Sequence, residues 1–385
     1  MNTNDTKAIE RIEETIEKLK QNKSVFYFFI VDCKNTPNAG IQHMYQFAKT
    51  LADKNYKVKM IYQLENEYTK EELSELKRKE KEIDYNRIFT GVGDWLGKEY
   101  MEIDHLNISK NEWKVSPCDF LFIPEVFSSL MQQTYKYKAP CKRIVILHNY
   151  SYITEFIPFN AEWGTYGIRD VITTTERQKE LISSVFPYVK CKILKPYIDE
   201  CFRKPVRPKK LIVNIISKRT EDVNRIMKQF YWKYPMYRFV SFKDLRGFPK
   251  SKFSEYLQES AITIWVDSET PFGYSAIEAI RCGNIVIGKV PEQIPEWMGD
   301  NEGLFDNGVW TYDINAIPDI LSRVLGSWMR NEVPSVLYEN MENLNNLYTV
   351  EEWNKNVDSI ISGYINNRIN EFTEIKTAIM SKNRN

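Results

Sequence analysis

The chain has 385 residues, of which 43% are hydrophobic and 14% aromatic, so it can bury two cores and is not disordered. Its 53 basic and 52 acidic residues nearly balance, which argues against a protein whose whole surface binds nucleic acid. The six cysteines form no CxxC pair and the three histidines lack metal-ligand spacing, so we expect no metal and no cofactor.

The first expected element is a helix within residues 1–23. Four aliphatic residues of this segment fall on one helical face: Ile9, Ile12, Ile16 and Leu19. We expect this face to pack on the body of the chain or to support oligomerisation. The segment is too polar for a signal peptide, and the sequence contains no apolar run near the roughly 20 residues of a membrane span. These features predict a cytoplasmic protein without a transmembrane segment, at most peripheral to a membrane.

Residues 24–197 alternate strands with helices. The apolar run at 24–31 suits a strand buried on both faces, and a loop, a helix at 41–54 and a strand at 57–62 follow it. Strand, helix, strand is the unit that builds parallel sheets. Further elements are expected in this order: a solvated helix at 69–84 and strands at 119–123, 143–147 and 170–173. We therefore assign residues 24–197 to a Rossmann-like domain.

A proline-rich linker at 198–208 precedes a second alternation at 209–345. Its expected elements are strands at 211–216, 237–241, 261–266 and 284–289, with a helix at 223–232 and another after residue 273. A long helix is expected at 348–372, within the terminal segment 346–385. The sequence thus predicts two doubly wound parallel sheets in tandem, whose natural ligand site is the cleft outside the strand carboxyl ends.

The strand–turn–helix at 261–283 contains the residues best suited to bind a nucleotide. A helix that begins after a glycine turn, here Gly273, presents free N–H groups and a partial positive charge to a diphosphate. One turn further along, Glu278 can accept hydrogen bonds from the paired hydroxyls of a ribose. The competing interpretation is that Glu278 only complements the helix dipole.

The stretch TPFGYSAIEAIRCG at 270–283 resembles the donor-binding signature of family 4 glycosyltransferases with the GT-B fold. That signature reads Glu-Pro-Phe-Gly, four residues, Glu-Ala, and a turn ending in Gly. Weaker similarities follow the same order at four other places: 38–40, 170–181, 195–202 and 348–353. The resemblance implies two Rossmann-like domains facing a cleft, retention of anomeric configuration, and a terminal segment that packs back on the first domain.

The resemblance also implies roles for individual residues. Glu278 would hold the ribose, the loop containing Ala39 and Gly40 would approach the donor phosphates, and His148 would reach the donor sugar. The competing interpretation of His148 is a histidine that caps a buried strand. The cations expected beside the diphosphate, and the remaining residues expected at the donor, are these: Lys218, Arg219, Arg225, Gly273, Tyr274 and Ser275.

Several positions depart from the family pattern. The first glutamate of the signature falls on Thr270, Glu269 stands one position early, and the first glycine of the amino-terminal loop is Ala39. The family's second cation is also missing from its usual place, where Arg225 is the nearest substitute. These departures bear on donor geometry and on activity.

We therefore expect a glycosyltransferase that moves a sugar from a nucleotide sugar to an acceptor glycan or another hydroxyl compound. Retention follows from the resemblance, and the absence of any Asp-x-Asp motif predicts independence of metal ions. One alternative is a DNA-modifying glycosyltransferase, because residues 225–253 interleave basic and aromatic side chains. Binding of nucleic acid is not favoured, since most of these aromatics are spaced for burial. A non-catalytic nucleotide-sugar-binding or assembly protein is also compatible with the sequence, and a GT-B epimerase is less favoured.

Overall fold

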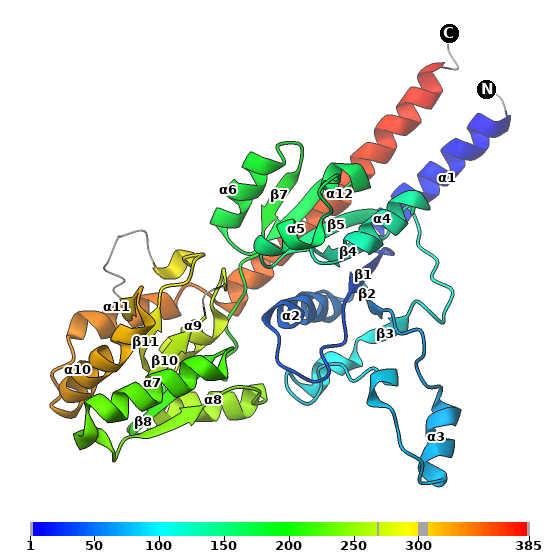
Figure 1. Ribbon diagram of the computed structural model, residues 1–385. Coiled ribbons are helices and arrows are strands. Elements are labelled where there is room, and N and C mark those ends of the chain that lie inside the picture. The colour runs from blue at the N-terminus through cyan, green and yellow to red at the C-terminus, as the bar shows by residue number, and fades with distance from the viewer. Residues whose placement is uncertain (1–2, 268, 299–306, 383–385) are drawn as a thin grey trace. The chain divides into compact units, whose positions relative to one another are not determined.

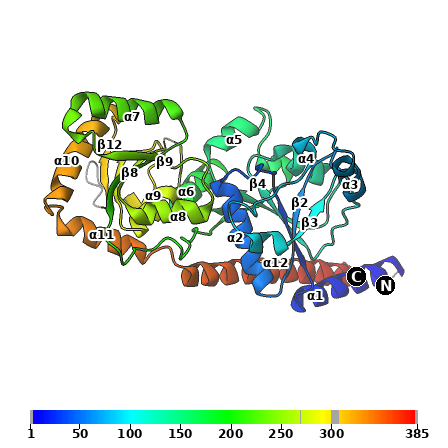
Figure 2. The same cartoon turned by 90° about the horizontal axis from the view of Figure 1, so that it is seen from below.

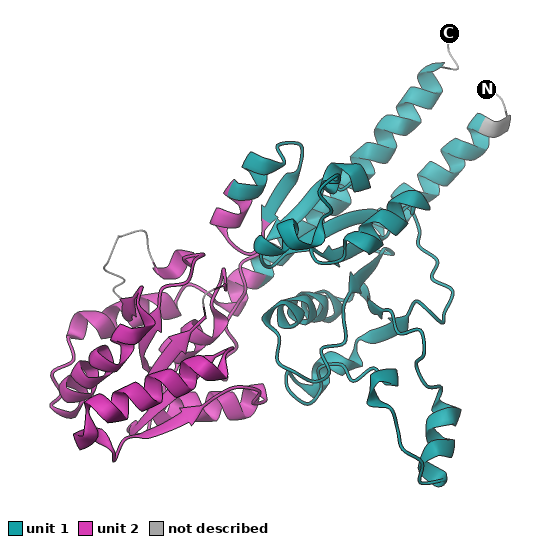
Figure 3. Ribbon diagram, in the orientation of Figure 1, with its two compact units in different colours: residues 1–173, 181–192, 354–385 teal, residues 174–180, 193–353 magenta. Residues whose placement is uncertain are grey.

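The computed structural model describes residues 3–267, 269–298 and 307–382 (Figure 1). The chain divides into two compact units (Figure 3). Unit 1 comprises residues 1–173, 181–192 and 354–385, and unit 2 comprises residues 174–180 and 193–353. Each unit is built on its own sheet, of seven and five strands respectively. The expected fold class, with two doubly wound parallel sheets, is confirmed.

The first strand of unit 1 in chain order lies in the middle of the sheet, and the later strands lie on both sides of it. Its strand order is β3 (Asp104–Asn107), β2 (Lys57–Tyr62), β1 (Val25–Phe29), β4 (Phe120–Pro124), β5 (Lys142–Leu147), β6 (Asp170–Thr173) and β7 (Lys190–Ile193). Phe26 of β1 lies opposite Val58 on one side and Phe120 on the other. The rings of Phe26 and Phe120 stack 5.0 Å apart, so the apolar run that predicted β1 forms the centre of the core.

Unit 1 contains helices that connect these strands and one helix at each end of the chain. They are α1 (Thr3–Lys20), α2 (Ala39–Asp53), α3 (Lys70–Arg78), α4 (Ser128–Lys136), α5 (Ser151–Phe156), the end of α6 (Glu176–Val185) and most of α12 (Val350–Lys382). The helix expected at 69–84 is shorter, because Thr69 and Glu72 form a capping box at its start and Glu80 takes a left-handed φ of 51° beyond its end.

The terminal helix α12 docks on unit 1 through polar as well as apolar groups. Arg368 donates hydrogen bonds to the carbonyl oxygens of Pro117 (3.1 Å) and Pro140 (2.9 Å). Further along, Lys376 pairs with Glu13 of α1 at 2.5 Å. Figures 1 and 2 accordingly show α1 beside the last turns of α12.

The sheet of unit 2 has β10 at its centre. Its strand order is β12 (Val309–Thr311), β11 (Ile285–Lys289), β10 (Ser260–Val266), β8 (Lys210–Ser217) and β9 (Ser241–Asp244). Its helices are α7 (Thr220–Lys233), α8 (Lys250–Glu259), α9 (Tyr274–Arg281), α10 (Ile317–Met329) and α11 (Ser335–Asn345). In both units, short 3-10 turns complete the fold: Tyr85–Arg87, Lys98–Glu102, Trp163–Tyr166, Pro235–Tyr237, Glu296–Met298 and Ile314–Ala316.

The strand expected at 237–241 is wrong. Pro235 begins a 3-10 turn there, and the ring of Tyr237 stacks on the buried Phe230 of α7 at 5.7 Å. The strand β9 begins only at Ser241, after this turn has brought the chain back to the sheet edge.

Candidate functional site

The cations predicted for unit 2 follow β8 at the carboxyl edge of the sheet. Ser217, the last residue of β8, lies opposite Val266, the last residue of β10, so the two following residues meet. These are Lys218 and Asp267, whose Nζ and Oδ2 atoms lie 3.2 Å apart. The Lys218 side chain is 68% exposed, so it can turn toward an added phosphate, but Asp267 competes for its charge.

The two predicted arginines are exposed. Arg219 is the N-cap residue of α7, where its N–H donates to Ser217 Oγ at 3.1 Å. Its guanidinium Nε lies 4.0 Å from Asp222, close to the limit of an ion pair. Arg225 stands further along α7, on the exposed side of that helix. Of the two, Arg219 is therefore the one at the strand end where a phosphate would bind.

The turn at Gly273 packs against two tryptophan side chains. Gly273 has a left-handed φ of 76°, and a Cβ placed on it would lie 3.2 Å from Trp297 and 3.3 Å from Trp265. Trp297 donates from Nε1 to the carbonyl of Phe272 at 2.5 Å. Trp265 donates from Nε1 to Ser275 Oγ at 3.1 Å. Backbone conformation and packing thus both require glycine at this position.

Thr270 stabilises the same turn with a hydrogen bond to its side chain. Its Oγ1 accepts a hydrogen bond from the N–H of Gly273 at 3.2 Å. A hydroxyl therefore stabilises the loop at the position where the family signature has a carboxylate. Glu269 is exposed, and its N–H donates to Asp267 Oδ1 at 3.2 Å. Tyr274 packs edge-to-face on Phe272, with ring centroids 4.8 Å apart.

Glu278 lies on α9 and is only 6% exposed. Burial raises the pKa of its carboxyl to about 8, with Lys250 opposing the shift and Asp199 adding to it. Lys250 is itself held by Asp199, at an Nζ–Oδ2 distance of 2.8 Å. Glu278 is thus a carboxyl that binds its proton tightly and lacks the hydration of a surface group, which suits either a buried structural acid or an acid awaiting ligand hydroxyls.

The residues predicted in unit 1 meet at the carboxyl edge of its central strands. His148 directly follows β5, and a Cβ placed on Gly40 of α2 would lie 3.4 Å from its ring. Two residues that sequence reasoning missed complete the group. Glu125 follows β4, with its Oε2 3.4 Å from His148 Nδ1, and His43 of α2 places its Nδ1 3.2 Å from His148 Nε2.

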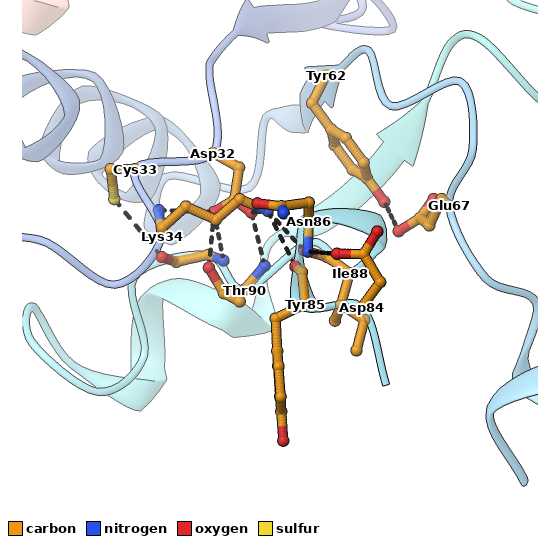
Figure 4. Close-up of polar contacts among 11 residues, drawn as sticks. Asp32, Cys33, Lys34, Tyr62, Glu67, Asp84, Tyr85, Asn86, Ile88 and Thr90 are labelled. Carbon is orange, nitrogen blue, oxygen red and sulfur yellow. Dashed lines mark hydrogen bonds and ion pairs between the residues drawn. The ribbon is translucent and has the colours of Figure 1, made fainter. Parts of the chain in front are cut away.

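The loop that leads into α2 is anchored by Asp32 (Figure 4). Its carboxylate accepts hydrogen bonds from the N–H (3.0 Å) and hydroxyl (2.8 Å) of Thr90, and pairs with Lys34 at 3.1 Å. Burial alone would raise the pKa of Asp32, but the bonds from Thr90 and Lys34 outweigh it and the pKa is lowered. At the end of the loop, Asn38 caps Ile41 N–H at 3.0 Å, and Ala39 is the first residue of the helix.

Most aromatic side chains of the basic and aromatic stretch at 225–253 pack on the core of unit 2. Phe230 is fully buried and packs against Tyr231, Tyr234 and Tyr237. Only Trp232 and Phe239 of its aromatic side chains are largely exposed among the residues that the structure describes. The prediction that burial explains these aromatics is therefore supported for most of them.

Two kinds of feature are absent from the part of the chain that the structure describes. No group of three or more histidine, cysteine, aspartate or glutamate side chains is arranged to bind a metal ion within 3–267, 269–298 and 307–382. Over the same ranges, no helix combines the length and apolar composition that crossing a membrane requires.

Comparison with known proteins gives a likeness in structure only. No protein-family model and no curated protein matches the sequence. Sucrose-phosphate synthase from Thermosynechococcus elongatus superposes with a TM-score of 0.55 at 13% identity, over 89% of this chain and 99% of that one. The pneumococcal O-GlcNAc transferase GtfA, in complex with UDP and GlcNAc, gives 0.58 at 10% identity, over 88% and 99%. The chain has the GT-B fold.

A third structure with this fold is a TarM mutant from S. aureus in complex with fondaparinux, alpha-GlcNAc-glycerol and UDP. It superposes with a TM-score of 0.58 at 11% identity, over 88% of this chain and 99% of that one. Identities this low show a shared GT-B fold and leave the chemistry to be argued from the residues of this chain.

Proposed function

We propose that the protein is a glycosyltransferase that uses a nucleoside-diphosphate sugar as donor. The observation that carries this proposal is the turn and helix at 270–281. It lies at the carboxyl end of β10, the central strand of unit 2, and combines a required glycine with a buried carboxyl one turn beyond it. Parallel α/β sheets bind ligands outside the carboxyl ends of their strands, and helix starts bind phosphates.

In this proposal, unit 2 binds the nucleoside diphosphate. The N–H groups at the start of α9, with Arg219 and Lys218, stabilise the charge of the departing diphosphate. Glu278 accepts hydrogen bonds from the ribose hydroxyls. Tyr274 and Ser275 are the first residues of α9, and Glu269 and Thr270 precede it in the turn. Arg225 of α7 is assigned to the diphosphate as a further cation. UDP was bound to GtfA and to TarM in the structures named above, which makes UDP sugars the first donors to test.

The sugar is assigned to residues of unit 1. His148 would contact the transferred sugar, with Gly40 and Ala39 beside it at the start of α2. The described site offers no carboxylate that is free of donors at this sheet edge, since Glu125 is bound to residues 148–149. We therefore propose no side-chain nucleophile. Retention would follow if the departing phosphate helps to deprotonate the acceptor hydroxyl, without a metal or other cofactor.

A second candidate function is nucleotide-sugar binding without transfer. Two observations favour it. The Thr270 hydroxyl accepts a hydrogen bond that closes the turn, at the position where the signature has a carboxylate. Lys218 is paired with Asp267, so it is not freely available to a phosphate. If the protein is a transferase, its acceptor is a glycan or another hydroxyl compound. If it only binds the nucleotide sugar, it has no acceptor.

A thermal-shift screen against nucleotide sugars tests the proposal. A true donor at about 100 times its Kd adds roughly 2.7 kcal/mol to the free energy of unfolding. Donors that stabilise the protein are then incubated with it, and release of nucleoside diphosphate is measured. Stabilisation with release, both lost in Glu278→Ala, supports the enzyme. Stabilisation without release in the presence of any hydroxyl acceptor supports the binder, and stabilisation by no nucleotide sugar contradicts both.

A further inference from the structure

Glu125, His148 and His43 form a continuous hydrogen-bonded chain at the carboxyl edge of the sheet in unit 1. Glu125 comes from the end of β4, His148 from the end of β5, and His43 from α2. The two imidazole rings are nearly perpendicular, at 85°, with centroids 5.2 Å apart. The role assigned above to His148 makes no use of Glu125 or His43, although both lie within hydrogen-bonding range of its ring.

The carboxylate determines where the proton of His148 lies. Glu125 is only 2% exposed. Its Oε1 accepts the backbone N–H groups of His148 (3.1 Å) and Asn149 (2.8 Å), and its Oε2 lies 3.4 Å from His148 Nδ1. A carboxylate can only accept hydrogen bonds, so the Nδ1 atom must carry a proton. The other ring nitrogen, Nε2, then accepts from His43 Nδ1 at 3.2 Å.

We infer that Glu125 is a positioning residue that fixes both the tautomer and the orientation of His148, with His43 as the second support. This inference rests on the proposed function, because it assigns Glu125 and His43 a role in sugar transfer. A ring held at both nitrogens keeps one orientation, and a sugar hydroxyl that displaces His43 from Nε2 meets the ring in that geometry. The start of α2 packs against this ring, since a Cβ placed on Gly40 would lie in van der Waals contact with it at 3.4 Å.

The tautomer is tested without any substrate. The chain has only three histidines, so their ring nitrogens can be resolved by nitrogen NMR and assigned with single substitutions. We expect His148 to carry its proton on Nδ1. In Glu125→Gln, the amide oxygen stays on the two backbone N–H groups and the NH₂ group faces Nδ1, so the His148 proton moves to Nε2 and His43 carries its proton on Nε2 instead of Nδ1. An unprotonated Nδ1 in the wild type, or no change in the variant, overturns the inference.

The consequence for transfer is tested next, with the donor found in the screen. Losing the outer hydrogen-bond partner of a metal-ligating histidine lowers activity on the order of 10- to 100-fold, and we expect an effect of the same order for His148. We expect Glu125→Gln to lower kcat by this factor and to leave KM for the donor nearly unchanged, because Glu125 touches the histidine and not the nucleotide.

Glu67→Gln is the matched control. Glu67 is also a partly buried carboxylate of unit 1, and it accepts hydrogen bonds from Tyr62 (2.9 Å) and Asn107 (2.7 Å), neither of which is near His148 in sequence. We expect it to change neither the His148 tautomer nor kcat. If Glu125→Gln moves the proton but transfers sugar as fast as the wild type, the positioning role is overturned.

Failure of the proposed function remains distinguishable. If the protein turns over no nucleotide sugar, the hydrogen-bonded group of Glu125, His148 and His43 has no role in sugar transfer. The NMR measurement still decides whether Glu125 sets the tautomer of His148.

Discussion

Substituting Gly273 by alanine separates the two reasons for which glycine stands at the candidate donor turn. The first is the left-handed φ of 76°, which costs a residue with a Cβ about 1–2 kcal/mol. The second is contact with Trp297 at 3.2 Å and Trp265 at 3.3 Å, closer than a Cβ normally packs. These indoles are held in a cluster with Trp310, so they yield little, and overpacking of this kind costs about 1–3 kcal/mol.

Gly247 provides the matched control. It has nearly the same φ, 74°, and a Cβ there would meet nothing within 4 Å. Gly247→Ala should therefore lower the free energy of unfolding by the backbone cost alone, about 1–2 kcal/mol. Gly273→Ala should lower it by roughly 2–5 kcal/mol, the sum of both costs. Urea denaturation measures both values.

Donor binding gives the second readout. Because the alanine displaces the turn that precedes α9, Gly273→Ala should also weaken donor binding by at least about tenfold. Gly247→Ala should leave the affinity unchanged. Equal destabilisation by the two variants would refute the packing argument. Unchanged donor affinity in Gly273→Ala would refute the assignment of this turn to the donor.

Further predictions concern the charged residues. Because burial raises the Glu278 pKa from 4.5 to about 8, its contribution to stability is complete below pH 4.5 and is lost as the pH rises through 8. Glu278→Gln should therefore gain stability relative to the wild type as the pH rises, and an equal pH dependence of unfolding would contradict this. Asp267→Asn should change stability by less than about 1 kcal/mol, because Lys218 is exposed, yet tighten the binding of a nucleoside diphosphate in calorimetry. Weaker binding would show that Asp267 does not compete with the phosphate. Asp32→Ala should destabilise the protein by about 2–4 kcal/mol through loss of its charged hydrogen bonds, and a loss under about 1 kcal/mol in urea denaturation would contradict its role as an anchor.

The sequence predicted those parts of the fold that depend on local patterns. The apolar run at 24–31 predicts β1, and the spacing from Gly273 to Glu278 predicts a turn followed by a helix. The edge strands β3, β7 and β12 were not predicted, because they are only three or four residues long, and β3 and β7 also carry several polar side chains. Their strand conformation comes from pairing with a neighbour in the sheet.

The candidate site was predicted in part for a similar reason. His148 and Lys218 could be proposed because each follows an apolar strand directly. Glu125 and Asp267 also follow such strands, but their significance depends on which strands are neighbours in the sheet. That order becomes known only once β4 lies beside β5, and β8 beside β10. The contact of His43 with His148 joins positions 105 residues apart, which no local pattern contains.

The central claim is that Glu278 recognises the ribose of a nucleotide. Calorimetry with UDP and with 2′,3′-dideoxy-UDP, on the wild type and on Glu278→Gln, measures the coupling between this side chain and the ribose hydroxyls. Removing the hydroxyls should weaken binding to the wild type by roughly 1.5–3 kcal/mol and weaken binding to the variant much less. Equal losses of affinity in the two proteins would contradict the claim. If the wild type binds another nucleotide and not UDP, the same comparison is made with that nucleotide, and equal losses there would also contradict the claim.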